Sequence, residues 1–264
     1  MPEIAIPLVL REAHDRWIAD GRKEQIAMRW YPRSWRDRLV DYRSVLDQLP
    51  SQVCRSDAAE WAVGIDNAHR AGEAFVAAMV WGYGPVGYGP YRTARILEEN
   101  EQATERLLKI AEPAVEGDRM RAFRQAANSP LKHLGVAFGT KFLYFCSLAS
   151  GDDRAIAPVL DSVVADWLSQ HTPFSPKIDS WRPKDYERYV DLLQCWADQL
   201  DERIDTVEQL IFDSEWAVPA GTRTPTADIA STLAQLRRLV NDLDPAVTDR
   251  CEPHLTELRA LTSC

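Results

Sequence analysis

A helical repeat of apolar residues, which recurs along the chain, constrains the fold more than any other feature of the sequence. In residues 93–112, 184–213 and 226–243, apolar side chains return every three or four positions among many charged ones, the pattern of an amphipathic helix. No run of alternating apolar and polar residues is long enough to indicate a sheet. The sequence therefore predicts an all-α fold.

Glycine and proline gather at three places, which we interpret as joints between groups of helices. These joints are residues 81–90, 129–139 and 171–183. A chain of 264 residues can bury one substantial core but is short for several domains. We therefore expect a single two-lobed helical domain over residues 1–264, with the termini packing into the second lobe.

Charge and hydropathy narrow the classes of function. The net charge of −9 argues against a protein that coats nucleic acid over its whole surface. No segment approaches the ~20 apolar residues that cross a bilayer, and no signal peptide is visible, so we predict a cytoplasmic protein with no membrane partner. The five cysteines form no C-x-x-C pair, so zinc and redox motifs are not indicated. No obligate protein partner is inferred.

One segment departs from this acidic background. Residues 119–151 contain no Asp or Glu, and their basic side chains are Arg119, Arg121, Arg124, Lys132 and Lys141. An acidic protein with one basic, acid-free segment is what a local contact with phosphates would look like. A chance gap in the acidic residues is the alternative.

The same segment has the pattern of a helix, a glycine-bearing turn and a second helix. A break at 128–130 is followed by a turn at Gly135–Gly139, an apolar helix at 140–149, and a further helix that opens at Asp161. Backbone N–H groups at such a turn bind a phosphate whatever the base sequence. Glycine lets the DNA approach closely and permits the positive φ that such a turn needs.

Residues 119–170 resemble the helix-hairpin-helix DNA glycosylases, the superfamily of 8-oxoguanine glycosylase and endonuclease III. LGVAFGTK at 134–141 is similar to the family pattern L-P-G-V-G-T-K, and PVLDSVV at 158–164 is similar to P-V-D-T-H-V. The likeness is closest to bacterial 8-oxoguanine DNA glycosylase-like proteins. The hairpin departs from the pattern because it lacks the proline and contains Ala137 and Phe138 in addition. The His that follows the family's Asp is also replaced.

The resemblance implies that Lys141 and Asp161 are the catalytic residues of an enzyme that flips a modified base out of duplex DNA and excises it. Lys141 is expected in the first helical turn after the hairpin, near the positive helix end and apolar surface, which together favour the nucleophilic neutral amine. Asp161 is expected to cap the next helix and to stabilise positive charge on the sugar or activate the nucleophile. A solvent-facing lysine and a purely structural cap are the alternatives.

Further residues are predicted to contact the DNA. The expected phosphate contacts are Lys132, His133, Gly135, Val136, Gly139, Thr140 and Arg92. WGYGPVGYGP at 81–90 combines flexible backbone with aromatic rings that could stack on an extruded base, and a packed aromatic loop is the equal alternative. The candidates for this base pocket or wedge are Trp81, Tyr83 and Tyr88, with Trp30 and Tyr31 from an arginine-rich segment as weaker ones.

The partner that the resemblance implies is double-stranded DNA with a modified base. Oxidised guanine is the family default, and a phage-type base such as glucosylated hydroxymethylcytosine would instead imply antiphage defence. No cofactor or catalytic metal is predicted, although the likeness admits a monovalent cation at the hairpin. Two alternatives stay open: a non-catalytic helix-hairpin-helix DNA-binding protein, and a helical interaction module without DNA affinity. The enzyme hypothesis requires Lys141 and Asp161 to face one cleft within roughly 10 Å of each other.

Overall fold

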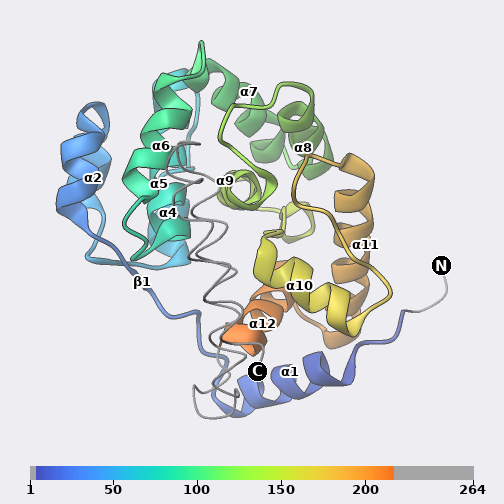
Figure 1. Cartoon of the computed structure of the whole chain (residues 1–264). Helices are drawn as coiled ribbons and strands as arrows, with labels where there is room; N and C mark the ends of the chain where they lie inside the picture. Colours follow the sequence, from blue (N-terminus) through green and yellow to red (C-terminus); the bar gives the residue numbers. More distant parts are fainter. Residues whose placement is uncertain (1–3, 217–264) are drawn as a thin grey trace, which may run out of the picture. The chain divides into compact units, whose positions relative to one another are not determined.

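The computed structural model describes residues 4–216, and nearly all of its regular structure is helical (Figure 1). The α-helices are α1 (Leu8–Ala19), α2 (Pro32–Arg38), α3 (Arg43–Gln48), α4 (Arg55–Glu60), α5 (Ala68–Tyr83), α6 (Gly89–Glu98), α7 (Ala103–Val115), α8 (Arg119–Asn128), α9 (Val136–Leu148), α10 (Ser162–His171), α11 (Pro183–Leu200) and α12 (Ile204–Trp216). Two short 3-10 helices accompany them, η1 (Val40–Tyr42) and η2 (Asp153–Ala155). The all-α prediction is confirmed.

The strands of the described region are two residues long each. β1 (Met28–Arg29) pairs with β2 (Gln52–Val53) in antiparallel register, with Met28 opposite Val53. Alternation of apolar and polar residues needs about four residues before it can be recognised, so a pair this short leaves no signal in the sequence.

Two of the three periodic segments are each broken into two helices by a left-handed residue. Residues 93–112 divide between α6 and α7, where Gln102 has φ of 51° and the Asn100 side chain donates to the Ile96 carbonyl at 2.9 Å. Residues 184–213 divide between α11 and α12 at Asp201, which has φ of 55°. Asp201 is the C-cap of α11, whereas Gln102 is the N-cap of α7. The apolar repeat resumes beyond each of these residues, so periodicity alone merges each pair of helices. The third segment, 226–243, lies outside the described residues.

The core is built around α5, α7 and α9, which pack against one another, and α9 also packs on α8. In Figure 1 α9 is seen nearly end-on between α5 and α8. Every residue from Ala71 to Trp81 of α5 is buried, as is every residue from Gly139 to Ser147 of α9. A polar side chain in either of these stretches therefore lies inside the protein, where it needs a partner.

The N-terminal segment is tied to the end of α11. Gln199 donates to the Ile4 carbonyl at 3.0 Å, and His14 of α1 lies 3.3 Å from Glu202, which follows α11. Residues up to Glu215 form one compact unit. The two-lobed domain over the whole chain stays a prediction, because its C-terminal part lies outside the described residues.

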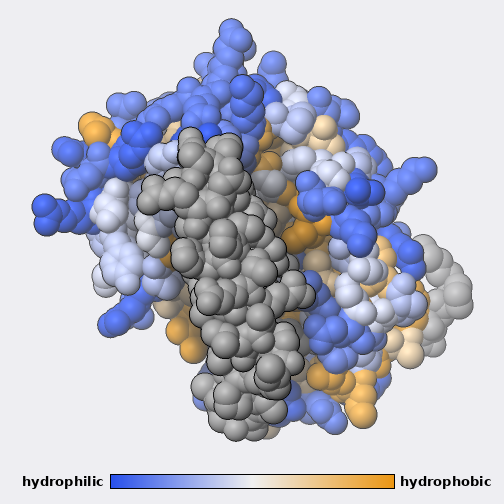
Figure 2. Space-filling model, viewed as in Figure 1, coloured by the Kyte–Doolittle hydropathy of each residue, from blue (hydrophilic) through white to orange (hydrophobic). Residues whose placement is uncertain are grey.

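The surface seen in Figure 2 is mostly hydrophilic, with apolar residues in small groups. Within residues 4–216 no helix combines the length and the apolar composition that crossing a membrane requires. The cytoplasmic location stays a prediction.

Candidate active site

Lys141 and Asp161 form a buried ion pair. Lys141 Nζ donates to Asp161 Oδ2 at 2.7 Å, and the two side chains are only 8% and 11% exposed. α9 supplies the lysine, and the residue just before α10 supplies the aspartate. The distance that the enzyme hypothesis requires is therefore met, while the shared cleft stays a prediction.

The position of Lys141 within α9 differs from the prediction. Gly135 is the N-cap of α9, so Val136–Gly139 is its first turn and Lys141 lies in the second. Ala137 and Phe138 are therefore helical residues rather than an enlargement of the hairpin. The helix dipole acts mainly within the first turn, so the environment of Lys141 is set by its neighbours rather than by the helix end.

Aromatic rings and a glycine surround the lysine side chain. Lys141 Nζ lies 5.8 Å from the Trp81 ring centroid and 5.6 Å from that of Phe138. A Cβ on Gly82 would lie 2.8 Å from Lys141 Cδ, so the absence of a side chain there lets the lysine stem lie against α5. Aromatic faces attract cations. Residues 81–84 (WGYG) and 139–141 (GTK), which are far apart in the sequence, therefore meet at the Lys141 amine.

Asp161 is the N-cap of α10, as predicted. Its Oδ1 accepts from the N–H groups of Val163 and Val164 at 3.1 and 3.2 Å, while its Oδ2 faces Lys141. Burial raises the pKa of the Asp161 carboxyl, but the charge and hydrogen bond of Lys141 and the two backbone N–H groups outweigh burial and leave this pKa below its ordinary value. The carboxylate is thus ionised and rigidly held at neutral pH.

Thr140 links the two elements that carry the pair. Its hydroxyl donates to the Val136 carbonyl at 2.9 Å and accepts from the Leu160 N–H at 3.0 Å. The residue before Asp161 is therefore joined to the residue before Lys141. Thr140 is fully buried, so its predicted contact with a phosphate is wrong and its role is to position Asp161.

Two tyrosines of α11 hold the rest of the segment that leads to Asp161. The hydroxyls of Tyr186 and Tyr189 donate to the carbonyls of Pro158 and Val159 at 2.9 and 2.6 Å. Burial raises the pKa of both phenols well above the ordinary value, so they remain donors. The backbone that presents Asp161 is thus anchored at successive residues.

The two glycines of the predicted hairpin differ in their surroundings. A Cβ on Gly139 would lie 2.2 Å from the Trp181 ring, so Gly139 admits the indole, and its predicted contact with DNA is wrong. Gly135 is exposed, and a Cβ there would meet nothing within 4 Å. Neither glycine has positive φ, contrary to the expected turn. The left-handed residue of this loop is His133, with φ of 68°.

Of the other hairpin candidates, Lys132 is exposed and His133 is engaged. The Lys132 N–H donates to Asn100 Oδ1 at 2.7 Å, which ties the loop to the α6–α7 connection. His133 Nε2 lies 2.8 Å from Glu99 and 3.0 Å from Arg95. Hydrogen bonds from Arg95 and His133 lower the pKa of Glu99 to about 2. A phosphate at His133 would therefore have to displace the Glu99 carboxylate.

The Val136 side chain is buried, so only its backbone could reach DNA.

The acid-free basic segment is largely neutralised in the fold. Three of its arginines are bonded elsewhere: Arg119 to the Ile156 carbonyl, Arg121 to Glu116 and Arg124 to Glu187. Acidic residues from outside residues 119–151 thus pair with Arg121 and Arg124. Arg121 and Arg124 are exposed but paired, whereas Lys132 is exposed and has no carboxylate partner within residues 4–216.

The aromatic candidates of the 81–90 segment are packed. Trp81 and Tyr83 lie in the last turn of α5 and are buried, with Trp81 edge-on to Phe145 and Tyr83 stacked on Phe138 at 4.0 Å. The half-buried Tyr88 contacts Tyr83 edge-on. The prediction of a flexible stacking loop at Trp81 and Tyr83 is wrong, because the helix continues through both residues.

The remaining candidates are dispersed. Trp30 is buried against Trp35 and donates to the Pro50 carbonyl at 2.6 Å, so it is a core residue. Tyr31 is 58% exposed, and Arg92 is half-buried on α6.

Sequence reasoning missed a second buried ion pair. Arg55, the first residue of α4, donates to Glu208 of α12 at 2.8 Å, and its guanidinium carbon lies 5.2 Å from the Trp81 ring centroid. Burial raises the pKa of Glu208 to about 7, although the charge and hydrogen bond of Arg55 oppose this. One signal was present: Glu208 shares an apolar stripe with Ile204, Val207 and Ile211.

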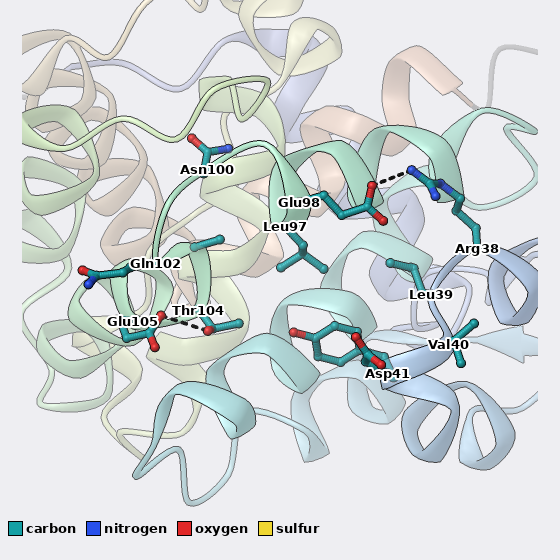
Figure 3. A pocket seen from close by; sticks show the side chains of 12 residues that line it. Arg38, Leu39, Val40, Asp41, Leu97, Glu98, Asn100, Gln102, Thr104 and Glu105 are labelled. Carbon is teal, nitrogen blue, oxygen red and sulfur yellow. Dashed lines mark hydrogen bonds and ion pairs between the residues drawn. The ribbon is translucent and has the colours of Figure 1, made fainter.

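A cavity of about 330 Å³ lies between η1 and the α6–α7 connection (Figure 3). Its lining includes Asp41, Glu105 and the pair of Arg38 with Glu98, joined at 2.6 Å. Neither Lys141 nor Asp161 lines it, so this cavity is not the base pocket of the predicted site.

Comparison with known proteins identified a family that matches most of the chain. The model of the family described as "Putative 8-oxoguanine DNA glycosylase OGG-like protein" matches residues 21–212. The matched range contains both ion pairs, the α8–α9 unit and the aromatic segment. No curated protein and no solved structure matches the chain.

Proposed function

The chain belongs to the OGG-like family described as "Putative 8-oxoguanine DNA glycosylase OGG-like protein", and on that premise we propose that it excises a modified base from duplex DNA at Lys141 and Asp161. The observation that carries the proposal is the buried Nζ–Oδ2 contact of 2.7 Å between these two residues. Groups that share one reacting centre must converge on it, and these two converge inside the matched region.

Asp161 is suited to stabilise the positive charge that develops on the deoxyribose as the bond from C1′ to the base breaks. Its carboxylate is ionised and held by two backbone N–H groups, so it needs no reorganisation when that charge forms. The bonding electron pair leaves with the base, which takes up a proton.

Two routes then follow from Lys141. In the first, the Lys141 ammonium gives up a proton, which the departing base takes up, and the resulting amine leaves Asp161 and forms a C1′–Nζ bond. Cleavage of the C1′–O4′ bond, with transfer of a proton from nitrogen to O4′, then opens the sugar ring and gives a Schiff base that permits strand scission. In the second, Lys141 positions the substrate while Asp161 directs a water to C1′, and the product is an intact abasic site.

The grip on duplex DNA is proposed for the start of α9. The first N–H groups of a helix have no acceptor within it, and those of α9 follow the exposed Gly135. The exposed Lys132 is on the same loop. An N-terminus with an adjacent cation suits a phosphate, and a cation at the hairpin carbonyls stays a prediction from the family likeness.

The experiment is a base-release assay on matched duplexes that carry 8-oxoguanine, glucosylated hydroxymethylcytosine or no modification. Abasic sites are scored by alkali cleavage, and Schiff bases by borohydride trapping. We expect release of oxidised guanine, with trapping abolished in Lys141→Gln if the lysine is the nucleophile. Release of only the glucosylated base would indicate phage defence rather than repair.

The alternatives predict other results in the same assay. Salt-sensitive duplex binding without release of any base would indicate a non-catalytic DNA-binding protein. Absence of binding to every duplex would leave a helical interaction module.

A further inference from the structure

Arg55 is held on several sides at the edge of the Lys141–Asp161 pair. Its Nε donates to Gln25 Oε1 at 3.0 Å and its Nη2 donates to Glu208 Oε2 at 2.8 Å. Its guanidinium carbon lies 4.9 Å from the Tyr144 ring centroid, in addition to its contact with Trp81. The side chain is 14% exposed, so the guanidinium plane is fixed within the protein.

One nitrogen of this guanidinium lacks an acceptor. Arg55 Nη1 is buried, and in the part of the chain that the structure describes no atom accepts a hydrogen bond from it. The Tyr144 hydroxyl, which donates to Asp205 at 3.0 Å, interacts with the guanidinium but not in a geometry that satisfies Nη1. Buried charged donors are nearly always satisfied in folded proteins, so an unsatisfied one points to a ligand that supplies the acceptor.

Arg55 borders the proposed catalytic pair. The Trp81 ring that it contacts is the ring from which Lys141 Nζ is 5.8 Å away. Tyr144 follows Lys141 by three residues on α9, so both are on one face of that helix. The charge of Glu208, the partner of Arg55, interacts with those of Asp161 and Lys141.

We propose that Arg55 is a base-recognition residue whose Nη1 donates a hydrogen bond to a carbonyl oxygen of the extruded base. This inference rests on the proposed glycosylase function. A guanidinium only donates, so its ligand must present an acceptor. Arg55 already pairs with Glu208 at 2.8 Å and Lys141 with Asp161 at 2.7 Å, so a neutral carbonyl fits better than a phosphate. Gln25 and Glu208 hold the plane, and a fixed donor discriminates between bases that have and lack the oxygen.

The test uses Arg55→Lys, which keeps the charge and the reach to Glu208 but removes the planar Nη1 donor. Excision is measured on matched duplexes carrying 8-oxoguanine or analogues that lack one carbonyl oxygen. We expect Arg55→Lys to lower excision of 8-oxoguanine by roughly 10- to 100-fold, the range for a hydrogen bond to a charged group. Removing the recognised oxygen from the substrate should cost the wild type a similar factor and cost Arg55→Lys nothing further.

A second readout separates recognition from support of the fold. Affinity for a duplex with a tetrahydrofuran abasic-site analogue, which has no base, should stay at the wild-type value in Arg55→Lys. Arg38→Lys, at a surface ion pair with Glu98, is the matched control.

Three outcomes would overturn the inference. The first is wild-type excision by Arg55→Lys, and the second is an equal loss on all bases whatever oxygens they carry. The third is a parallel loss of affinity for the abasic analogue. A wild type that releases no base would instead refute the proposed function, and the inference with it.

Discussion

The two buried ion pairs of the site have carboxyl groups with opposite titration behaviour. The pKa of Asp161 is lowered, whereas that of Glu208 is raised to about 7, although each carboxylate is buried and accepts a hydrogen bond from a cation. Asp161 precedes α10 and accepts two backbone N–H groups as well, whereas Glu208 lies in the second turn of α12, beyond the free N–H groups of that helix. In this protein the charge and hydrogen bond of Arg55 do not offset the burial of Glu208, whereas for Asp161 the contact with Lys141 and the two N–H groups of a helix start together do.

The largest effect is expected from removing the carboxylate that the helix start holds. Asp161→Ala leaves Lys141 buried without its partner and α10 without its cap, so the free energy of unfolding should fall by about 3–5 kcal/mol, with roughly 1 kcal/mol more from the cap. Denaturant unfolding measures it. Asp161→Asn, which keeps a cap, should lose less. If Asp161→Ala lowered the free energy of unfolding by less than about 1 kcal/mol, the proposed difference between the Lys141–Asp161 and Arg55–Glu208 pairs would be contradicted.

The second prediction concerns pH. The pKa of Glu208 rises from 4.5 in the unfolded chain to about 7 in the folded one, so between these values the folded state binds more protons. Glu208 therefore makes stability fall as pH rises through this window, by roughly 3 kcal/mol in all. Asp161 acts with the opposite sign, since its lowered pKa contributes stability that is lost on acidification.

Unfolding free energies of the wild type and Glu208→Gln at pH 4.5 and 8 test this prediction. The fall between the two pH values should be smaller in Glu208→Gln. Equal falls in both proteins would show that Glu208 titrates as an ordinary carboxyl.

The third prediction separates the two hairpin glycines. Gly139→Ala places a methyl group against Trp181 and should lower the free energy of unfolding by about 1–3 kcal/mol. Gly135→Ala meets open space, so it should remain folded but bind duplex DNA more weakly, because the methyl group obstructs the approach of a phosphate. Thermal melts and duplex titrations measure both. If Gly135→Ala destabilised the fold and left the DNA affinity unchanged, Gly135 would be a packing residue rather than a point of DNA approach.

The smallest expected effect comes from the lysine's packing partner. Gly82→Ala would press on Lys141 Cδ, at the flexible part of a side chain, and displace the amine from Asp161. Excision should fall by about tenfold with little change in melting temperature, since small misplacements of reacting groups are costly. Gly87→Ala, in the same segment but facing open space, is the control and should retain wild-type excision.

The sequence predicted those features that depend on local chemistry. The helical class followed from periodicity, the cap at Asp161 from a carboxylate just before an apolar helix, and the proximity of Lys141 and Asp161 from a family pattern. The start of α9 was misplaced because Gly135 and Gly139 were both interpreted as turn residues. Gly139 is instead helical, and the Trp181 that explains it is 42 positions away.

Features that depend on distant segments could not be predicted. The acid that pairs with Arg124 is Glu187, 63 positions away, and Arg55 meets Glu208 across 153 positions. α5 is buried over Ala71–Trp81, so it has little amphipathic pattern to mark its end. Its last residues were therefore interpreted as part of a flexible loop.

The most direct test of the central claim is the single-turnover excision rate of Asp161→Asn with enzyme in excess over the modified duplex. Asparagine keeps the cap of α10, so the variant should fold and bind the duplex, yet its excision rate should fall by at least about 100-fold. Excision at the wild-type rate by folded, DNA-bound Asp161→Asn would contradict the assignment of Asp161 to the chemistry and reduce it to a structural cap.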